Sequence, residues 1–133
     1  RLEENVIRPS TKLSLQVDSM LLNQSSFTDM PFRMTEQVGI IRTGTGIHEF
    51  VNDYPLHPIN LSNYTNQKIS YIHRYTASSL IATSALLRTE SRGGHYRHDY
   101  PTSAEEWTGK VIEQSIQGVS ISTRKIERKE TVK

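Results

Sequence analysis

The side chains best suited to chemistry gather between residues 89 and 101, in the run Thr-Glu-Ser-Arg-Gly-Gly-His-Tyr-Arg-His-Asp-Tyr-Pro. This run holds two arginines, two histidines, two carboxylates and two glycines. Arginine offers a planar fork of N–H donors that suits carboxylates and backbone carbonyls, and Glu90 and Asp99 supply such acceptors. Gly93 and Gly94 allow the backbone to leave a helix as C-capping residues with φ above zero. The run therefore predicts an ion-pair network that terminates a helix.

A metal site and a catalytic site are two other interpretations of the same run. His95, His98 and Asp99 carry ordinary metal-ligand groups, but their spacing matches no closed motif. Arg92 and Arg97 are interleaved with them and would repel a cation. A histidine close to an aspartate also suits acid–base chemistry, yet no nucleophile accompanies the pair. The ion-pair network explains the run better, so we assign it neither metal ligands nor catalytic residues.

Two other patterns could indicate a binding site. Gly44-Thr45-Gly46 begins like a dinucleotide-binding loop, but Glu49 stands where the third glycine belongs and no strand precedes it. We therefore predict a turn between helices and no cofactor-binding residues. His48, His57 and His73 have no carboxylate or histidine at ligand spacing, so we interpret each as a surface or helix-capping residue.

Composition limits the class of protein. A chain of 133 residues with 35% apolar residues fits one domain with one core. Its formal charge of +2 is too small to indicate nucleic-acid binding, although the basic stretch 124–133 could attract phosphate or remain a solvated tail. The chain has no cysteine, which permits a reducing compartment, and we expect a cytoplasmic protein. No apolar run reaches the roughly 18 residues of a membrane span.

The elements that must position the run are mostly helices. Apolar residues recur at helical spacing over 11–23 and again over Pro31 to Arg42, where Asp29 serves as N-cap after a polar break at 23–26. Thr43 to Gly46 should end the second helix, and a helical pattern resumes from Ile47 to Tyr54. Residues 61–89 contain no proline or glycine and predict the central helix. One buried stripe of that helix comprises Tyr64, Tyr71, Tyr75, Ser78, Ala82 and Ala85.

The C-terminal part of the chain predicts strands. Val119, Ile121 and Thr123 alternate with serines in a period of two, which indicates a hairpin of 110–115 with 119–125. The predicted fold is mainly α, an antiparallel three- to four-helix bundle with a small C-terminal β-hairpin. We expect a single domain over 1–133, with a linker at 1–10, the bundle and motif loop at 11–101, and the hairpin and basic tail at 102–133.

Residues Glu90 to Pro101 resemble the C-terminal helical domain of the flavoprotein family of fumarate reductase, succinate dehydrogenase and L-aspartate oxidase. That family ends its long helix with Glu-Ser-Arg-Gly-Ala-His-x-Arg-x-Asp-(Phe/Tyr)-Pro, followed by a tryptophan, and Trp107 matches that tryptophan. Gly94 departs from the commoner alanine. A second block, Met34 to Arg42, is similar to the family's Val-Gly-Ile-x-Arg helix, and the two blocks with their spacing cover about seventy residues.

Within the family the resemblance favours the L-aspartate oxidase branch. Gly-Ile-Ile-Arg and His-Tyr-Arg-x-Asp-Tyr-Pro are similar to that branch, and 102–106 lacks the Arg-Asp-Asp run that follows the proline in the dehydrogenases. The resemblance implies an FAD enzyme that oxidises L-aspartate to iminoaspartate, toward quinolinate and NAD. It also implies that the FAD domain, the capping domain and the substrate-binding residues precede this stretch. The chain starts at Arg1 without methionine, so we expect a fragment that lacks them.

The resemblance therefore implies no catalytic, cofactor-binding or metal residue here, and FAD only in the full-length enzyme. The expected partners are the FAD and capping domains of the same protein, with no membrane or nucleic acid, and the isolated fragment could self-associate. A flavoprotein-subunit domain of succinate dehydrogenase or fumarate reductase, and a free-standing helical module for an acidic partner or RNA, stay open. Arg92 and Arg97 either are buried in the bundle or face the FAD domain. The structural and interface motif comprises Glu90, Ser91, Arg92, Gly93, Gly94, His95, Arg97, Asp99, Tyr100 and Pro101.

Overall fold

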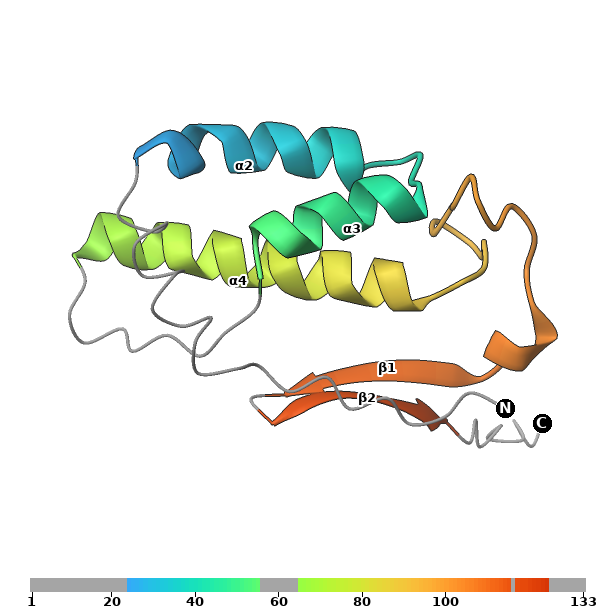
Figure 1. Ribbon diagram of the computed structural model, residues 1–133. Coiled ribbons are helices and arrows are strands. Elements are labelled where there is room, and N and C mark those ends of the chain that lie inside the picture. The colour runs from blue at the N-terminus through green and yellow to red at the C-terminus, as the bar shows by residue number, and fades with distance from the viewer. Residues whose placement is uncertain (1–23, 56–64, 116, 125–133) are drawn as a thin grey trace, which may run out of the picture.

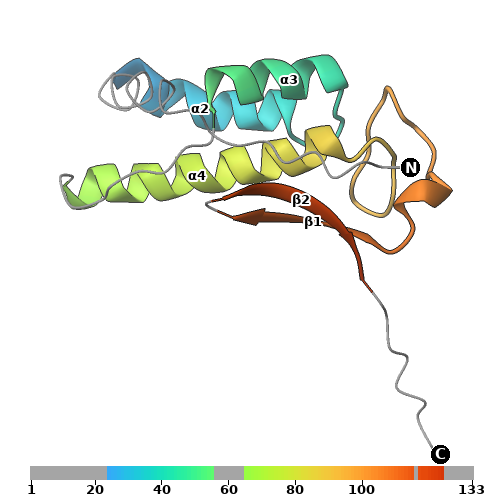
Figure 2. The same cartoon turned by 60° about the horizontal axis from the view of Figure 1, so that its bottom comes forward.

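The computed structural model describes residues 24–55, 65–115 and 117–124 (Figure 1). The elements in chain order are α2 (Gln24–Gln37), α3 (Gly44–Asp53), α4 (Asn66–Leu87), the short 3-10 helix η2 (Glu105–Trp107), β1 (Lys110–Ser115) and β2 (Gly118–Thr123). The helices α2 and α3 lie on one side of α4, and the hairpin lies on the other (Figures 1 and 2). This confirms the predicted mainly α class with a C-terminal hairpin. The predicted linker, the helix over 11–23, His57, Tyr64 and the tail from 125 lie outside the described residues.

The second predicted helix is displaced along the chain. It was expected over Pro31 to Arg42, but α2 already includes 24–26 and ends at Gln37, so Asp29 lies inside the helix and is not its N-cap. Pro31 is also internal to α2. The helix ends before Gly39, where a Cβ atom would lie only 2.2 Å from the Thr35 carbonyl oxygen. The backbone therefore turns sharply against the last turn of α2, which only glycine permits.

The predicted turn at Thr43 to Gly46 is wrong, because both glycines belong to the first turn of α3. Thr43 is the N-cap, and its hydroxyl accepts a hydrogen bond from the Gly46 N–H at 3.1 Å. A threonine with extended backbone satisfies a free N–H group of the first turn, which compensates for the poor helix propensity of glycine. The turn between the helices thus lies before Thr43 and not on the glycines.

The core forms where α2 and α3 pack on α4. Tyr71, Tyr75, Ala82 and Ala85 are buried as predicted, but Ser79 takes the place predicted for Ser78. The remaining members of the apolar cluster are Met30, Val38, Ile47, Phe50, Tyr54 and Ile72. Each buried tyrosine should keep its hydroxyl paired, and the Tyr75 hydroxyl does donate to the Pro55 carbonyl at 2.9 Å.

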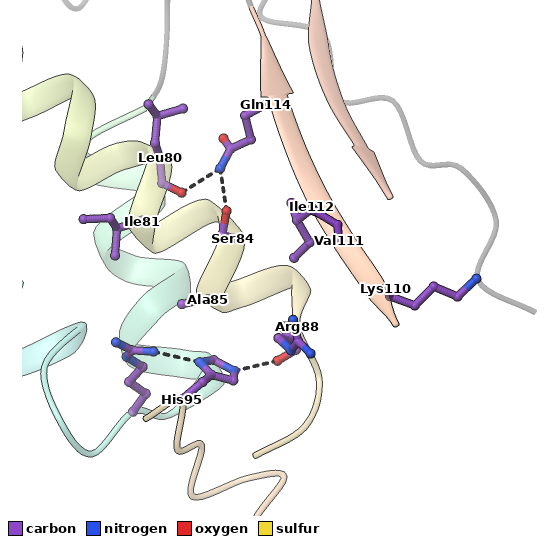
Figure 3. Close-up of a pocket in the computed structure, with 11 residues that line it drawn as sticks. Leu80, Ile81, Ser84, Ala85, Arg88, His95, Lys110, Val111, Ile112 and Gln114 are labelled. Carbon is purple, nitrogen blue, oxygen red and sulfur yellow. Dashed lines mark hydrogen bonds between the residues drawn. The ribbon is translucent and has the colours of Figure 1, made fainter. Parts of the chain in front are cut away.

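The hairpin matches its prediction closely. Strand β1 pairs antiparallel with β2, from Lys110 opposite Thr123 to Ser115 opposite Gly118. The amide of Gln114 ties β1 to α4 by donating to the Leu80 carbonyl at 2.7 Å and to the Ser84 hydroxyl at 2.6 Å (Figure 3). Among the described residues, no helix is long and apolar enough to cross a membrane.

Candidate functional site

A buried carboxylate, Glu90, forms the centre of the loop that follows α4. Its side chain is fully buried, and its Oε1 accepts from Nε and Nη2 of Arg88 at 2.9 and 2.7 Å and from Nε of Arg92 at 2.9 Å. Its Oε2 accepts from Nη2 of Arg92 at 3.1 Å and from the Ala104 N–H at 2.9 Å. Burial alone would raise the pKa of Glu90, but the hydrogen bonds from Arg92, Ala104 and Arg88 outweigh it and lower the pKa to about 2. Glu90 is therefore ionised at neutral pH.

The second ion pair, Arg97 with Asp99, joins two helix ends. Arg97 is 3% exposed and donates from Nε and Nη2 to the two carboxylate oxygens of Asp99 at 3.0 and 2.6 Å. Its Nη1 donates to the carbonyls of Leu86 at 2.7 Å and Arg88 at 3.3 Å. Carbonyls at a helix C-terminus lack helical partners and favour a cation, so Arg97 caps α4.

Asp99 completes this bridge by reaching α3. Its Oδ2 accepts from the Gly44 N–H at 3.1 Å, at the positive N-terminus of the helix. The hydrogen bond from Arg97 lowers the pKa of Asp99 and exceeds the opposing effect of burial. A Cβ atom on Gly44 would lie 2.5 Å from Asp99 Oδ2 and 2.6 Å from Arg97 Nη2. A side chain at the start of α3 would therefore displace this ion pair.

His95 links the loop to the segment between α2 and α3. Arg42 donates from Nη1 to Nδ1 of His95 at 2.7 Å and from Nε to the carbonyls of Val38 and Gly39 at 3.1 and 3.0 Å. Because arginine only donates, Nδ1 accepts, and Nε2 donates to the Arg88 carbonyl at 3.1 Å. Burial lowers the pKa of His95, and the charges of Arg42, Arg88 and Arg97 lower it further. His95 is thus a neutral connector.

Trp107 fixes the far end of the loop. Its side chain is fully buried, and its Nε1 donates to the Thr89 hydroxyl at 3.1 Å. The Arg88 guanidinium lies 5.4 Å from the centre of the indole ring, within the range of a cation–π contact. The segment from Ala104 to Trp107 is therefore attached to Glu90 through the Ala104 backbone and to Arg88 through the indole ring.

The predicted glycine cap is wrong. Helix α4 ends at Leu87 with Arg88 as C-cap at φ −81°, and no positive φ is needed there. Gly93 has φ +57° in a later turn, where the Arg92 N–H donates to the His95 carbonyl at 2.8 Å. Gly94 has no positive φ, and a Cβ atom there would meet nothing within 4 Å. Glycine is required at 93 by the left-handed backbone, but not at 94.

The structure brings most of the predicted motif together. Ser91 donates from its hydroxyl to the Tyr100 carbonyl at 2.7 Å and accepts from the Arg97 N–H at 2.9 Å, which closes the loop on itself. Gly94, Tyr100 and Pro101 lie on the exposed side. The sequence left open whether Arg92 and Arg97 are buried. Arg97 is buried in the domain, whereas the Arg92 side chain is 42% exposed and forms an ion pair with the buried Glu90.

Three members of the site were not assigned from the sequence. Arg88 directly precedes the motif, Arg42 ends the second motif block, and Gly44 was interpreted as part of a turn. The available signal for Arg88 was its place two residues before Glu90, since a carboxylate can accept from two guanidinium groups. Nothing in the sequence links Arg42 to His95, which lies 53 residues later. The described residues contain no group of three or more histidine, aspartate or glutamate side chains that could hold a metal ion.

This arrangement is that of a helical domain in which ion pairs and hydrogen bonds hold the loop after α4 in place. A model of the family described as "Fumarate reductase flavoprotein C-term" matches residues 28–132. The chain belongs to this family, as the resemblance of the two sequence blocks had indicated.

Several curated relatives are similar to this chain. L-aspartate oxidase of Bacillus subtilis (strain 168) is 29% identical over 96 residues, which cover 70% of this chain and 18% of that protein. L-aspartate oxidase of Saccharolobus solfataricus is 45% identical over 76 residues, covering 56% and 14%. An uncharacterized FAD-dependent oxidoreductase of Methanocaldococcus jannaschii is 34% identical over 86 residues, covering 59% and 16%. The chain therefore spans less than a fifth of the length of these relatives.

A solved structure described as the Mycobacterium smegmatis Sdh1 complex in the apo form is also similar. It shares 23% sequence identity and a TM-score of 0.49, and the match covers 86% of this chain and 24% of that chain.

Proposed function

We propose that this chain is the C-terminal domain of an FAD-dependent L-aspartate oxidase, which converts L-aspartate to iminoaspartate on the route to quinolinate and NAD. The observation that carries the proposal is that relatives of this name match the chain, including 45% identity over 76 residues. The domain boundaries proposed from the sequence, with a linker at 1–10 and one domain after it, fit this role. We also propose a cytoplasmic location for the enzyme.

In the glycine pair that begins like a dinucleotide loop, the N–H groups of both glycines already have partners. The one pattern that begins like a dinucleotide loop, Gly44-Thr45-Gly46, does form a helix N-terminus, which in other proteins binds pyrophosphate. Here the Gly44 N–H already donates to Asp99 and the Gly46 N–H donates to Thr43. No described residue is therefore assigned to the flavin or to the chemical step, and FAD belongs to the rest of the enzyme.

The role left for this domain is support of the FAD and capping domains. The backbone of Arg42 pairs with that of Arg97 in a parallel bridge, so the residues just before them, Ile41 and Tyr96, share the opposite face. Ile41 is 67% exposed, Tyr96 is 38% exposed, and the neighbouring Ile40 is 89% exposed. Large apolar side chains held on a rigid loop are typical of an interface. We propose that this face packs on the FAD domain.

A chimera tests the proposal. This chain replaces the matched C-terminal part of Bacillus subtilis L-aspartate oxidase, and flavin bleaching by L-aspartate is followed under anaerobic conditions. We expect the chimera to bind FAD and to be reduced by L-aspartate, and the same chimera with Ile41→Asp to lose flavin occupancy. Phe32→Asp is the control, because Phe32 is an exposed apolar residue on α2, outside that loop. A folded chimera that holds FAD but is not reduced by L-aspartate would contradict the proposal.

A second candidate is a flavoprotein domain of a succinate dehydrogenase or fumarate reductase. It is favoured by the family description and by 49% identity over 35 residues to one chain of the fumarate reductase (CoM/CoB) of Methanothermobacter marburgensis. Purification of the natural full-length protein distinguishes the candidates. Reduction of its flavin by L-aspartate supports the oxidase, whereas reduction by succinate alone supports this second candidate.

A further inference from the structure

An open groove lies between α4 and β1, and its lining includes Arg88, which forms an ion pair with Glu90 (Figure 3). Its volume is about 590 Å³, within the range of roughly 300 to 1,000 Å³ that is usual for ligand sites. Apolar side chains from both elements line it, namely Leu80 and Ile81 of α4 and Val111 and Ile112 of β1. Ile81 is 49% exposed. The groove therefore offers an apolar surface that residues 24–55, 65–115 and 117–124 leave uncovered.

The charged residues of this groove are all positive. Its lining contains Arg42, Arg88 and Lys110 but no carboxylate. Arg88 is neutralised by Glu90, whereas neither Arg42 nor Lys110 takes part in an ion pair among the described residues. Arg42 uses Nε and Nη1 for its hydrogen bonds, which leaves the two N–H groups of Nη2 without a partner in the described part of the chain. The Lys110 ammonium donates to the Thr123 hydroxyl at 2.8 Å and points away from α4 (Figure 3), so Arg42 is the cation of the lining that can pair with an anionic ligand.

One hydrogen-bond acceptor beside the groove, Oε1 of Gln114, has no donor among the described residues. The carbonyl of Leu80 can only accept, so its bond fixes Nε2 of Gln114 toward α4 and defines the orientation of the amide. Oε1 of Gln114 is then buried with no hydrogen-bond partner among the described residues. An unpaired buried acceptor is unfavourable. Because this atom is buried, a ligand in the groove would reach it only after the Gln114 side chain turned.

We propose that this groove binds a short acidic segment of a partner polypeptide, in which apolar side chains alternate with carboxylates. The apolar side chains would pack between Ile81 and Ile112, and a carboxylate would pair with Arg42. RNA suits the groove less well, because the lining has no phenylalanine, tyrosine or tryptophan on which a base could stack. This binding site is separate from the proposed flavoprotein role and does not depend on it.

Fluorescence anisotropy with the 133-residue chain tests the proposal. The probe is fluorescein-labelled Glu-Leu-Asp-Leu-Glu with a C-terminal amide, and its counterpart is Gln-Leu-Asn-Leu-Gln. We expect saturable binding of the acidic peptide and roughly tenfold weaker binding of the uncharged one. Addition of the acidic peptide should also shift the side-chain amide signals of Gln114 in the NMR spectrum.

Two variants at one exposed position separate charge from packing. Ile81→Glu and Ile81→Gln remove the same apolar contact and preserve helix propensity, but only the first adds a negative charge. We expect Ile81→Glu to bind the acidic peptide roughly tenfold more weakly than Ile81→Gln does, with equal thermal midpoints for both. Absence of saturable binding, equal binding of the two peptides, or equal binding by the two folded variants would each overturn the proposal. So would tighter binding of a single-stranded RNA, or a groove occupied by self-association of the chain.

Discussion

The two halves of α4 are held in place by different interactions. In its first half, Tyr75 packs edge to face with Tyr54 at a ring-centre distance of 5.8 Å, within an apolar cluster. At its C-terminal end, the buried Arg97 donates hydrogen bonds to the last carbonyls of the helix. The buried Glu90 forms ion pairs with two arginines. Apolar burial is non-directional and depends little on pH, whereas an ion pair depends on both direction and pH. The polar end is therefore the part of the domain in which single changes act most sharply.

Removal of Arg97 should have the largest effect and should show that the polar end contributes as much stability as the core. Arg97→Ala removes the donor to Asp99 and to the carbonyls of α4. Because the Asp99 side chain is 36% exposed, we expect the lower end of the roughly 3 to 5 kcal/mol that breaking a fully buried pair costs. Chemical denaturation monitored by circular dichroism measures the loss. Arg74→Ala, on the exposed face of the same helix, is the control and should change the free energy of unfolding by less than about 0.5 kcal/mol. Equal effects of the two variants would show that the polar end is dispensable.

Glu90 should give the polar end a pH dependence that the aromatic half lacks. Its folded pKa is lowered from 4.5 to about 2, so the stabilisation is complete above the unfolded pKa and is lost as the pH falls from 4.5 toward 2. Glu90→Gln should cost roughly 1.5 to 3 kcal/mol at neutral pH, since the arginines lose an ionised partner. Unfolding free energies measured between pH 2 and 6 should be flatter for the variant. An unchanged slope would assign the acid sensitivity to other groups.

Close packing at the start of α3 should distinguish two glycines. Gly44→Ala places a methyl group against Asp99 and Arg97, and such overpacking costs about 1 to 3 kcal/mol. Gly94→Ala is the matched substitution in open space and should be neutral or should stabilise by up to about 1 kcal/mol, because the unfolded chain loses freedom. Thermal midpoints compare the two. If Gly44→Ala were as well tolerated as Gly94→Ala, the bridge between α4 and α3 would not be tight.

The smallest effect is expected in the aromatic half. Tyr75→Phe removes only the hydrogen bond from the hydroxyl to the Pro55 carbonyl and keeps the ring contacts, so it should cost about 0.5 to 1.5 kcal/mol. The loss should be the same at pH 4 and pH 7. A pH-dependent loss would show that the two halves of α4 are coupled electrostatically, contrary to the division described above.

Some of this structure follows from the sequence because the signal is local. A period of two in 119–123 leaves little alternative to a strand, and the hairpin formed at the predicted residues. The absence of proline and glycine between 66 and 87 likewise specifies α4, and the motif after it predicts an ion-pair network from residue type alone. The family membership rests on the same short-range pattern.

Tertiary contacts decided the rest. The start of α3 at Gly44 depends on Asp99, more than fifty residues later, which accepts from its N–H and leaves no room for a side chain. Tertiary contacts also decided the burial of the two arginines. Arg97 is buried and Arg92 is half-exposed, although both lie in the same run. Residue type determines which groups can pair. The low dielectric that strengthens the attraction between them arises only when distant segments enclose the pair. The sequence by itself determined the chemistry of the loop, and the packing of α3 against α4 decided which of its charges became structural.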